Sequence, residues 1–291
     1  MKQSFTNKLH LSKSNTERLE VINAIIEEYL AEGYRLTLRQ LYYQLVSRDI
    51  IPNNVKEYGK ISTLLKEGRM AGKVDWEAIE DRTRVPHIPY YVTDIKDAMK
   101  DTIDQYRLDR MRDQDVYLEV WTEKDALSGI LKRVTEEYHV RLIVNKGYSS
   151  CSAMYEAYKR FNNAKSYGKN SHILYLGDHD PSGLDMIRDI GERLEEFSND
   201  DVQVKPIALT KKQIDKYNPP PNPAKEADPR ADWYIQNYGS TSWEVDALSP
   251  KVLTRLITNA IEGLIDRDKY DAIVEQEEKD KELIRGKFKL Q

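Results

Sequence analysis

The first 85 residues carry hydrophobic side chains at the spacing of three amphipathic helices. In the first of these helices the apolar positions recur every three or four residues, at Leu19, Ile22, Ile25, Ile26 and Leu30. A capping-box pattern precedes that run at 14–17, and a second one at 37–40 opens a helix with the sequence LRQLYYQLVSRD. Pro52 interrupts the pattern, and a third helical stretch runs from about 55 to 70.

A short alternation of apolar residues follows the third predicted helix, at Val74, Trp76 and Ile79. Such alternation is typical of a half-buried strand, and here it suggests a small hairpin. Three short helices followed by a hairpin make up the winged-helix form of the helix-turn-helix motif. We therefore predict a winged-helix DNA-binding domain over residues 1–85.

The pattern changes after a charged, helical connector that we assign to residues 86–113. Short, dense apolar runs now alternate with helical stretches, at 116–121, 141–145, 172–178 and 206–209. This alternation is typical of an α/β fold, in which a parallel sheet is flanked by crossover helices. We therefore expect residues 114–210 to form the core of a second domain.

Residues 211–291 are expected to complete that second domain. The segment 217–230 is rich in proline and is predicted to be a loop or extended arm. An amphipathic helix is predicted over 250–266. The final stretch, which begins at Glu275, is dominated by charged residues and is predicted to be solvated.

The composition narrows the classes of protein that remain. The single cysteine, Cys151, excludes an internal disulfide and a cysteine-based zinc site. No apolar run is long enough to span a membrane, and the first 20 residues lack the apolar segment of a signal peptide, so we expect a cytoplasmic protein without a membrane partner. The net charge of −4 argues weakly against a nucleic-acid partner, although an acidic metal site lowers net charge without removing a basic face.

Three acidic residues follow two of the predicted strands. Glu123 comes just after the first strand, and Asp178 and Asp180 come just after the third. Sites in open parallel sheets form beyond the carboxyl ends of the strands, so these carboxylates are expected to share one crevice. Mg²⁺ prefers oxygen ligands and shares its coordination with phosphates, and Mn²⁺ can substitute for it. The three acids therefore predict a metal site for phosphodiester chemistry, with His179 between them expected to be exposed.

These motifs resemble a known family. VYLEVWTEKDAL and LYLGDHDPSGLDM are similar to the Toprim domain of topoisomerases, primases and some nucleases. The Lys-Gly-Tyr segment at 146–148, the Asp-x-Asp-Pro-x-Gly motif at 178–183 and the Trp-Glu-Val-Asp-Ala-Leu segment at 243–248 resemble one branch more closely. That branch contains the A subunit of topoisomerase VI and the related proteins that make meiotic double-strand breaks. The resemblance spans roughly residues 116–248.

The same family carries a DNA-attacking tyrosine in its winged-helix domain, within an Arg-x-x-(Tyr/Phe)-Tyr motif. The resemblance implies that Tyr43 is the nucleophile, since Arg39-Gln40-Leu41-Tyr42-Tyr43 matches the motif. At about 100° per residue, Tyr43 should lie roughly 130° from the apolar stripe of its helix, beside Arg39, whereas Tyr42 belongs to the stripe. A phenol with a pKa near ~10 is a weak nucleophile, and the Arg39 guanidinium would favour the phenolate and hold the phosphate.

The resemblance also implies partners. Double-stranded DNA would be the substrate, the chain would act as a homodimer at the nucleoid, and a separate subunit would supply the ATPase that this sequence lacks. Lys124 and Lys146 are candidates for contact with the DNA phosphates. The chain departs from the family at Gln40, where aspartate is usual.

Two alternatives therefore stay open beside an enzyme similar to type IIB topoisomerases. The first is a Toprim nuclease that hydrolyses DNA with a metal and water, without a covalent tyrosine. The second is a non-catalytic DNA-binding assembly subunit.

Overall fold

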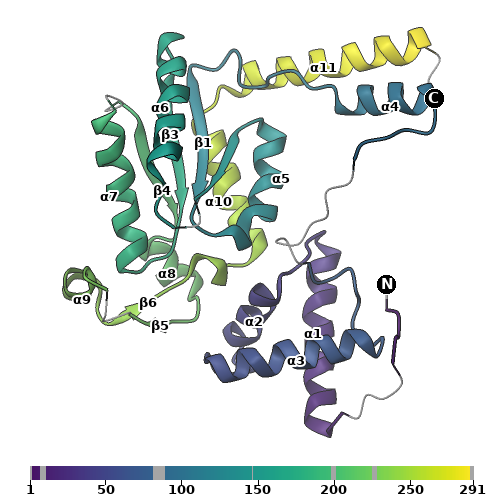
Figure 1. Cartoon of the computed structure of the whole chain (residues 1–291), viewed down its shortest axis with the longest axis vertical. Helices are drawn as coiled ribbons and strands as arrows, with labels where there is room; N and C mark the ends of the chain where they lie inside the picture. Colours follow the sequence, from purple (N-terminus) through teal and green to yellow (C-terminus); the bar gives the residue numbers. More distant parts are fainter. Residues whose placement is uncertain are drawn as a thin grey trace.

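The computed structural model describes residues 2–6, 11–80, 89–145, 147–197, 201–224 and 228–288, so the predicted DNA contact at Lys146 lies outside the described residues. Three N-terminal helices form one body, and a parallel sheet flanked by helices forms the other (Figure 1). The prediction of an α/β fold is therefore confirmed.

The N-terminal body consists of α1 (Lys13–Ala31), α2 (Leu38–Ser47) and α3 (Val55–Met70), whose apolar faces share one core. The predicted capping box of α2 is confirmed. Thr37 Oγ1 accepts a hydrogen bond from the Gln40 amide at 3.2 Å, and Gln40 Oε1 accepts one from the Thr37 amide at 2.9 Å. Gln40 is thus explained locally as a cap, a role in which glutamine and glutamate are interchangeable. The predicted cap of α1 at Ser14 is wrong, because Ser12 caps that helix instead.

The winged-helix prediction is not established. Residues 71–80 form turns and isolated bridges, with Ala71 paired to Ser4 and Ile79 paired to Leu36, and no hairpin is present among them. Residues 81–88, where the rest of the predicted hairpin would fall, lie outside the described residues. The three helices and the bridge at Ile79 define a helical domain with a short appended segment.

The sheet of the second body contains all four predicted strands: β1 (Val116–Thr122), β2 (Arg141–Val144), β3 (Asn170–Leu176) and β4 (Gln203–Ala208). The strand order is β2-β1-β3-β4 and every pairing is parallel, as predicted. Because side chains alternate between the faces of a strand, Leu118 and Val120 of β1 enter one core and Trp121 enters the other. The two central strands, β1 and β3, are therefore buried on both sides.

Helices cover both faces of this sheet. On one face lie α5 (Ser128–Tyr138) and α10 (Pro250–Glu262), and on the other lie α6 (Cys151–Ser166) and α7 (Pro181–Glu196) (Figure 1). The carboxyl ends of the strands point towards the N-terminal helices, so residues that follow β1 and β3 lie close to α2.

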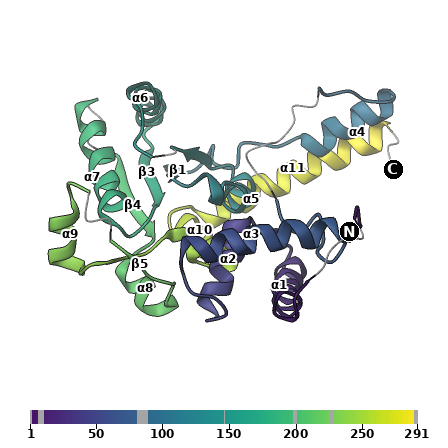
Figure 2. The ribbon, with the colours of Figure 1, turned by 60° about the horizontal axis from the view of Figure 1, so that its bottom comes forward.

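The proline-rich segment belongs to an arm beside the α/β body that also contacts the N-terminal body (Figures 1 and 2). After α8 (Lys211–Tyr217) the arm contains the short strands β5 (Asn222–Pro223) and β6 (Thr241–Ser242), with α9 (Ala231–Tyr238) between them. Asn53 joins the arm to the N-terminal body, since its Nδ2 atom donates to the Pro221 carbonyl at 3.1 Å and to Asn222 Oδ1 at 2.7 Å. Two single-turn 3₁₀ helices, η1 (Asp125–Leu127) and η2 (Val245–Ala247), follow β1 and β6.

The helices α4 (Ile95–Gln105) and α11 (Arg267–Phe288) lie side by side and project from the α/β body (Figures 1 and 2). The prediction that the charged end is simply solvated is wrong, because the Glu277 side chain has no exposed surface. Its carboxylate accepts hydrogen bonds from the Leu108 amide at 3.0 Å, from Arg110 at 3.1 Å and from Lys281 at 2.7 Å. These donors, two of them charged, offset the cost of burying the carboxylate. Among the described residues, no helix is long and apolar enough to cross a membrane.

Candidate active site

Two of the predicted metal ligands come together at the carboxyl ends of adjacent strands. Glu123 follows β1 directly, and Asp178 follows β3 after Gly177. The Asp178 amide donates a hydrogen bond to Glu123 Oε1 at 3.0 Å. The parallel pairing of β1 with β3 produces this contact, since it brings the two strand ends to the same edge of the sheet.

Asp178 is almost fully enclosed, with 9% of its surface exposed. Its Oδ1 atom accepts the Val245 amide at 2.9 Å, and its Oδ2 atom lies 2.6 Å from Lys124 Nζ. Burial raises the pKa of Asp178 to about 8, with Glu123 acting in the same direction and Lys124 opposing the shift. The pKa stays raised although Lys124 is close, so a further positive charge, such as a metal ion, would be needed to hold Asp178 ionised at neutral pH.

Asp180 is held by the helix that it begins. Its Oδ1 atom accepts hydrogen bonds from the Gly183 amide at 2.6 Å and from Ser182 Oγ at 3.0 Å, which makes Asp180 the N-cap of α7. A Cβ atom at Gly183 would lie 2.3 Å from the Asp178 carbonyl oxygen, so only glycine fits there. The Asp-x-Asp-Pro-Ser-Gly motif therefore packs the two aspartates against one tight turn.

Lys124 lies at the centre of the acidic group. Its Nζ atom is 2.6 Å from Asp178 Oδ2 and 3.3 Å from Glu244 Oε2. Burial lowers the pKa of Lys124, but the surrounding carboxylates outweigh burial and keep the ammonium charged. Lys124, which the sequence offered as a contact for a DNA phosphate, is therefore already paired with two carboxylates.

The residues suit a divalent cation by their chemistry. Every acidic side chain at this edge offers carboxylate oxygens, which are the ligand type of Mg²⁺. Both side-chain oxygens of Asp246 are buried without a well-aligned hydrogen bond, although Oδ2 lies 3.0 Å from Arg39 Nε. Among the described residues, no three acidic or histidine side chains are already gathered in the geometry of a metal site.

Tyr43 is buried, which corrects the expectation that it faces away from the core. Only 5% of its surface is exposed. The helix α2 packs on α1 with one side and approaches η2 with the other, and Ala247 of η2 joins the apolar core of the N-terminal body. The helical period places Tyr43 on the side of α2 opposite to α1. It cannot show that η2 of the α/β body approaches α2 on that side.

The Arg39 guanidinium is the link between α2 and the acidic group. It forms ion pairs with Glu244 and with Asp246, whose Oδ2 atom lies 3.0 Å from Arg39 Nε. It also lies 5.8 Å from the centre of the Tyr43 ring. Burial, Asp246 and Glu244 raise the pKa of Tyr43 above its usual range, and Arg39 only partly opposes this. In this arrangement Arg39 is ion-paired with Glu244 and Asp246, and it lowers the pKa of Tyr43 by less than the other groups raise it.

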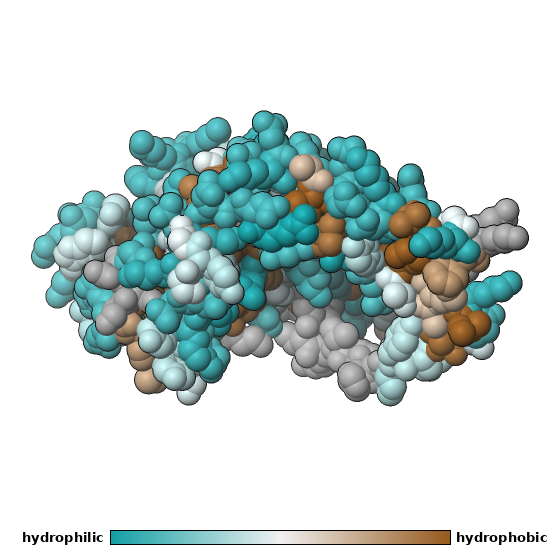
Figure 3. Space-filling model, turned by 90° about the horizontal axis from the view of Figure 1, so that it is seen from above, coloured by the Kyte–Doolittle hydropathy of each residue, from teal (hydrophilic) through white to brown (hydrophobic). Residues whose placement is uncertain are grey.

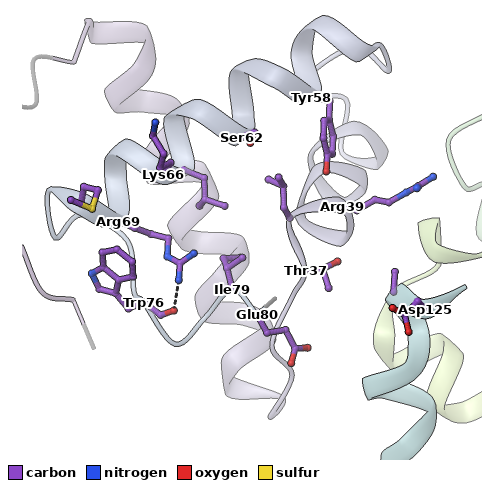
Figure 4. Close-up of a pocket in the computed structure, with 14 residues that line it drawn as sticks. Thr37, Arg39, Tyr58, Ser62, Lys66, Arg69, Trp76, Ile79, Glu80 and Asp125 are labelled. Atoms are coloured by element: carbon purple, nitrogen blue, oxygen red, sulfur yellow. Dashed lines mark hydrogen bonds between the residues drawn. The ribbon is translucent and has the colours of Figure 1, made fainter. Parts of the chain in front are cut away.

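Two pockets open on this region. One, of about 550 Å³, lies between the N-terminal body and the arm, and its lining includes Tyr43, Tyr58, Asn222 and Glu244. The other, of about 540 Å³, is shown in Figure 4, where Arg39 extends from α2 towards the α/β body. Lys66, Arg69 and Trp76 also line this second pocket.

Two features of the site escaped the sequence analysis. Asp246 belongs to the acidic group, and its spacing from Glu244 repeats the Asp-x-Asp spacing of Asp178 and Asp180, which was a usable signal. His179 is 2% exposed rather than exposed, because the backbone beside it bridges to Trp243 and its Nδ1 atom lies 2.9 Å from Tyr234 Oη. Only the folded arm supplies these partners.

No model of a known protein family and no curated protein matches this chain. The functional inference therefore rests on the side chains of this protein alone. They place buried and half-buried carboxylates, one half-buried lysine and a tyrosine–arginine pair around a single edge of a parallel sheet, an arrangement suited to binding a cation and a phosphate together.

Proposed function

We propose that this protein is a Mg²⁺-dependent DNA-cleaving enzyme similar to the A subunit of topoisomerase VI, with Tyr43 as its nucleophile. One observation carries the proposal. A continuous series of charged contacts runs from the Arg39–Tyr43 pair through Glu244 to Lys124 and on to Asp178. These contacts link the candidate nucleophile to Asp178 and so support the proposal of a shared site.

In the proposed reaction, Tyr43 Oη forms a bond to a phosphorus atom of the DNA as the bond from phosphorus to a sugar oxygen breaks. The phenol loses its proton and the released sugar hydroxyl gains one, so the phosphotyrosyl bond retains the energy needed for resealing. Arg39 would neutralise the phosphate after exchanging its carboxylate partners for it. Glu123, Asp178 and Asp180 would hold Mg²⁺, which supplies charge stabilisation for the developing oxyanion.

The proposal includes the partners that the resemblance implies. The substrate would be duplex DNA at the nucleoid, the chain would act as a homodimer, and a separate ATPase subunit would drive any strand passage. The four-stranded parallel sheet with helices on both faces supports it, since this is the arrangement expected of a Toprim core.

A hydrolytic nuclease is the second candidate, and the environment of Tyr43 favours it. A phenol that is 5% exposed, with a raised pKa, is a poor nucleophile unless α2 moves away from η2. Water bound near Asp178 would then attack instead, and the tyrosine would be structural. The third candidate, a non-catalytic assembly subunit, requires that the acidic site cleave nothing.

Supercoiled plasmid incubated with the full chain and MgCl₂, then denatured with SDS, separates these candidates. The proposal expects DNA ends covalently joined to protein, absent in Tyr43→Phe but kept in the control Tyr42→Phe on the same helix. Asp178→Asn should abolish cleavage altogether. Free ends that persist in Tyr43→Phe would assign hydrolysis, and intact plasmid under all conditions would assign a non-catalytic role.

A further inference from the structure

A third pocket, of about 510 Å³, lies far from the candidate active site. It is built from segments where strands begin, namely the loop before β1, the first residue of β2 and the turn before β3, together with the end of α6. Its cationic lining residues are Arg112, Arg141, Lys159, Arg160 and Lys169. Since β1 has seven residues of about 3.3 Å each, roughly 20 Å separate this pocket from Glu123.

The pocket is strongly basic in a chain that is acidic overall. Five of its lining residues are cationic and one, Asp109, is acidic, whereas the whole chain carries a net charge of −4. The pocket lies at the end of the sheet that Figure 3 faces, where the surface of the α/β body is largely hydrophilic. A local concentration of positive charge of this kind attracts polyanions even when the net charge does not.

Two of these cations have only neutral partners among the described residues. Arg141 is exposed, donates to Tyr117 Oη at 2.5 Å, and lies with its guanidinium carbon 5.6 Å from the centre of that ring. Lys169 Nζ donates to the carbonyls of Met111 and Arg112, at 2.7 and 3.0 Å. Both positive charges are therefore available to an anion.

Two residues that line the pocket, Tyr117 and Arg160, are held in place by the buried carboxylate of Glu119. Glu119 of β1 has no exposed surface, and it fixes Arg160 of α6 through two hydrogen bonds, at 2.6 and 3.0 Å. The same carboxylate accepts Tyr117 Oη at 2.7 Å, so the tyrosine on which Arg141 rests is fixed as well. A charged side chain set in this way is pre-organised for a ligand, because little side-chain entropy is left to lose on binding.

We propose that this pocket binds a nucleoside phosphate, with Arg141 and Lys169 on the phosphate and Tyr167 against the base. Arginine presents a planar fork of donors that matches phosphate oxygens. Tyr167 is 75% exposed at the end of α6 and lines the same pocket, which makes its ring available for stacking. Base–aromatic stacking beside a basic groove is the usual means of holding a nucleotide unit without reading its sequence.

The ligand chemistry has two sources, a nucleotide within a single strand and a free nucleotide. In either case binding occurs at the end of the sheet opposite to the proposed cleavage site, and it does not depend on cleavage. A single strand bound here would pass along the α6 side of the molecule rather than between the N-terminal helices and the sheet.

The test uses the full chain carrying Tyr167→Trp as a fluorescence reporter, read as the difference from the chain with only its four native tryptophans, in EDTA so that no cleavage occurs. Quenching is titrated with an eight-residue thymidine oligonucleotide, with ATP and with inorganic tripolyphosphate. Arg141→Glu in this background should weaken the binding responsible for quenching at least tenfold, and Lys169→Met should weaken it less. The control Lys132→Glu changes an exposed lysine of α5 and should leave binding unchanged.

The outcomes are distinct. Oligonucleotide binding that is tighter than ATP binding assigns the pocket to a nucleic-acid strand, and equal binding assigns it to a free nucleotide. The salt dependence of binding should fall by about one unit of slope in Arg141→Glu, because one phosphate is no longer neutralised by the protein. No quenching by either ligand, or equal affinity in Arg141→Glu and Lys132→Glu, overturns the proposal.

Discussion

The ammonium of Lys124 lies 2.6 Å from Oδ2 of Asp178, in an enclosure that exposes only 18% and 10% of the two side chains. The residues that follow the first strand thus supply both an acid, Glu123, and the positive charge that neutralises the acid after the third strand. A divalent cation bound to Asp178 would compete with this lysine for the same carboxylate. Lys124 therefore stabilises the site when no metal is bound, and a bound metal would displace it towards Glu244.

Replacing Lys124 with methionine should destabilise the protein, because it leaves Asp178 buried without its positive partner. Breaking a buried ion pair from one side costs about 3–5 kcal/mol. Urea denaturation in EDTA measures the change in the free energy of unfolding, and Lys132→Met, on an exposed lysine, is the matched control. Millimolar MgCl₂ should restore part of the stability of Lys124→Met. Equal effects of Mg²⁺ on both variants would contradict a shared position for the metal and the ammonium.

Gly183 should not tolerate alanine, since the added methyl group would lie 2.3 Å from the Asp178 carbonyl oxygen. Relief of such a clash requires the backbone of the turn to move, at a typical cost of about 1–3 kcal/mol. Gly191 of the same helix has open space around it, so Gly191→Ala should be neutral or stabilise by up to about 1 kcal/mol. Thermal unfolding of both variants compares them directly, and equal melting temperatures would disprove the tight turn.

Asp246→Asn should loosen the contact between the two bodies. The substitution removes the negative charge that lies 3.0 Å from Arg39 Nε, and removal of such a charged interaction costs about 1–3 kcal/mol. Amide hydrogen exchange in α2 should then speed up, while exchange in β1 and β3 stays unchanged. The control Asp271→Asn breaks an exposed pair within α11. Unchanged protection of α2 in Asp246→Asn would show that Arg39 does not hold the bodies together.

The pH dependence of stability should report on Glu277. Burial raises the pKa of this carboxyl, but hydrogen bonds from Lys281, Leu108 and Arg110 outweigh burial and lower its pKa to about 2. A folded pKa below the unfolded value of 4.5 contributes stability that is present above pH 4.5 and is lost as the pH falls towards 2. The stability difference between wild type and Glu277→Gln should therefore shrink over this window. Glu282→Gln, at an exposed position of the same helix, is the matched control.

Local patterns were sufficient for much of the architecture. The alternation of apolar runs and helical stretches located the four parallel strands, because a strand buried on both faces needs continuous apolar residues. The capping box at Thr37 was predictable for a similar reason, since both of its hydrogen bonds join residues three apart. The start of α1 was misplaced because the capping-box spacing of Ser14 and Glu17 favoured Ser14, whereas Ser12 caps the helix by accepting the Asn15 amide.

Contacts between distant segments decided the rest. The helical period placed Tyr43 opposite the core of its own domain, but the approach of η2 buried it from the other side. Likewise, the spacing of Glu123, Asp178 and Asp180 predicted a shared edge, yet nothing local indicated that Lys124 would lie among the carboxylates.

The sequence by itself thus determined the elements, the parallel sheet and the edge at which the acids gather. These depend on residue types and short spacings, which act within one helix, one strand or one turn. Only the tertiary structure decided how α2, the arm and the acidic group fit together, because burial and charge compensation depend on partners more than 200 residues apart, such as Arg39 and Glu244. The pKa of a side chain depends on its neighbours in the folded protein. Only the tertiary structure therefore determined that the pKa values of Tyr43 and Asp178 are raised.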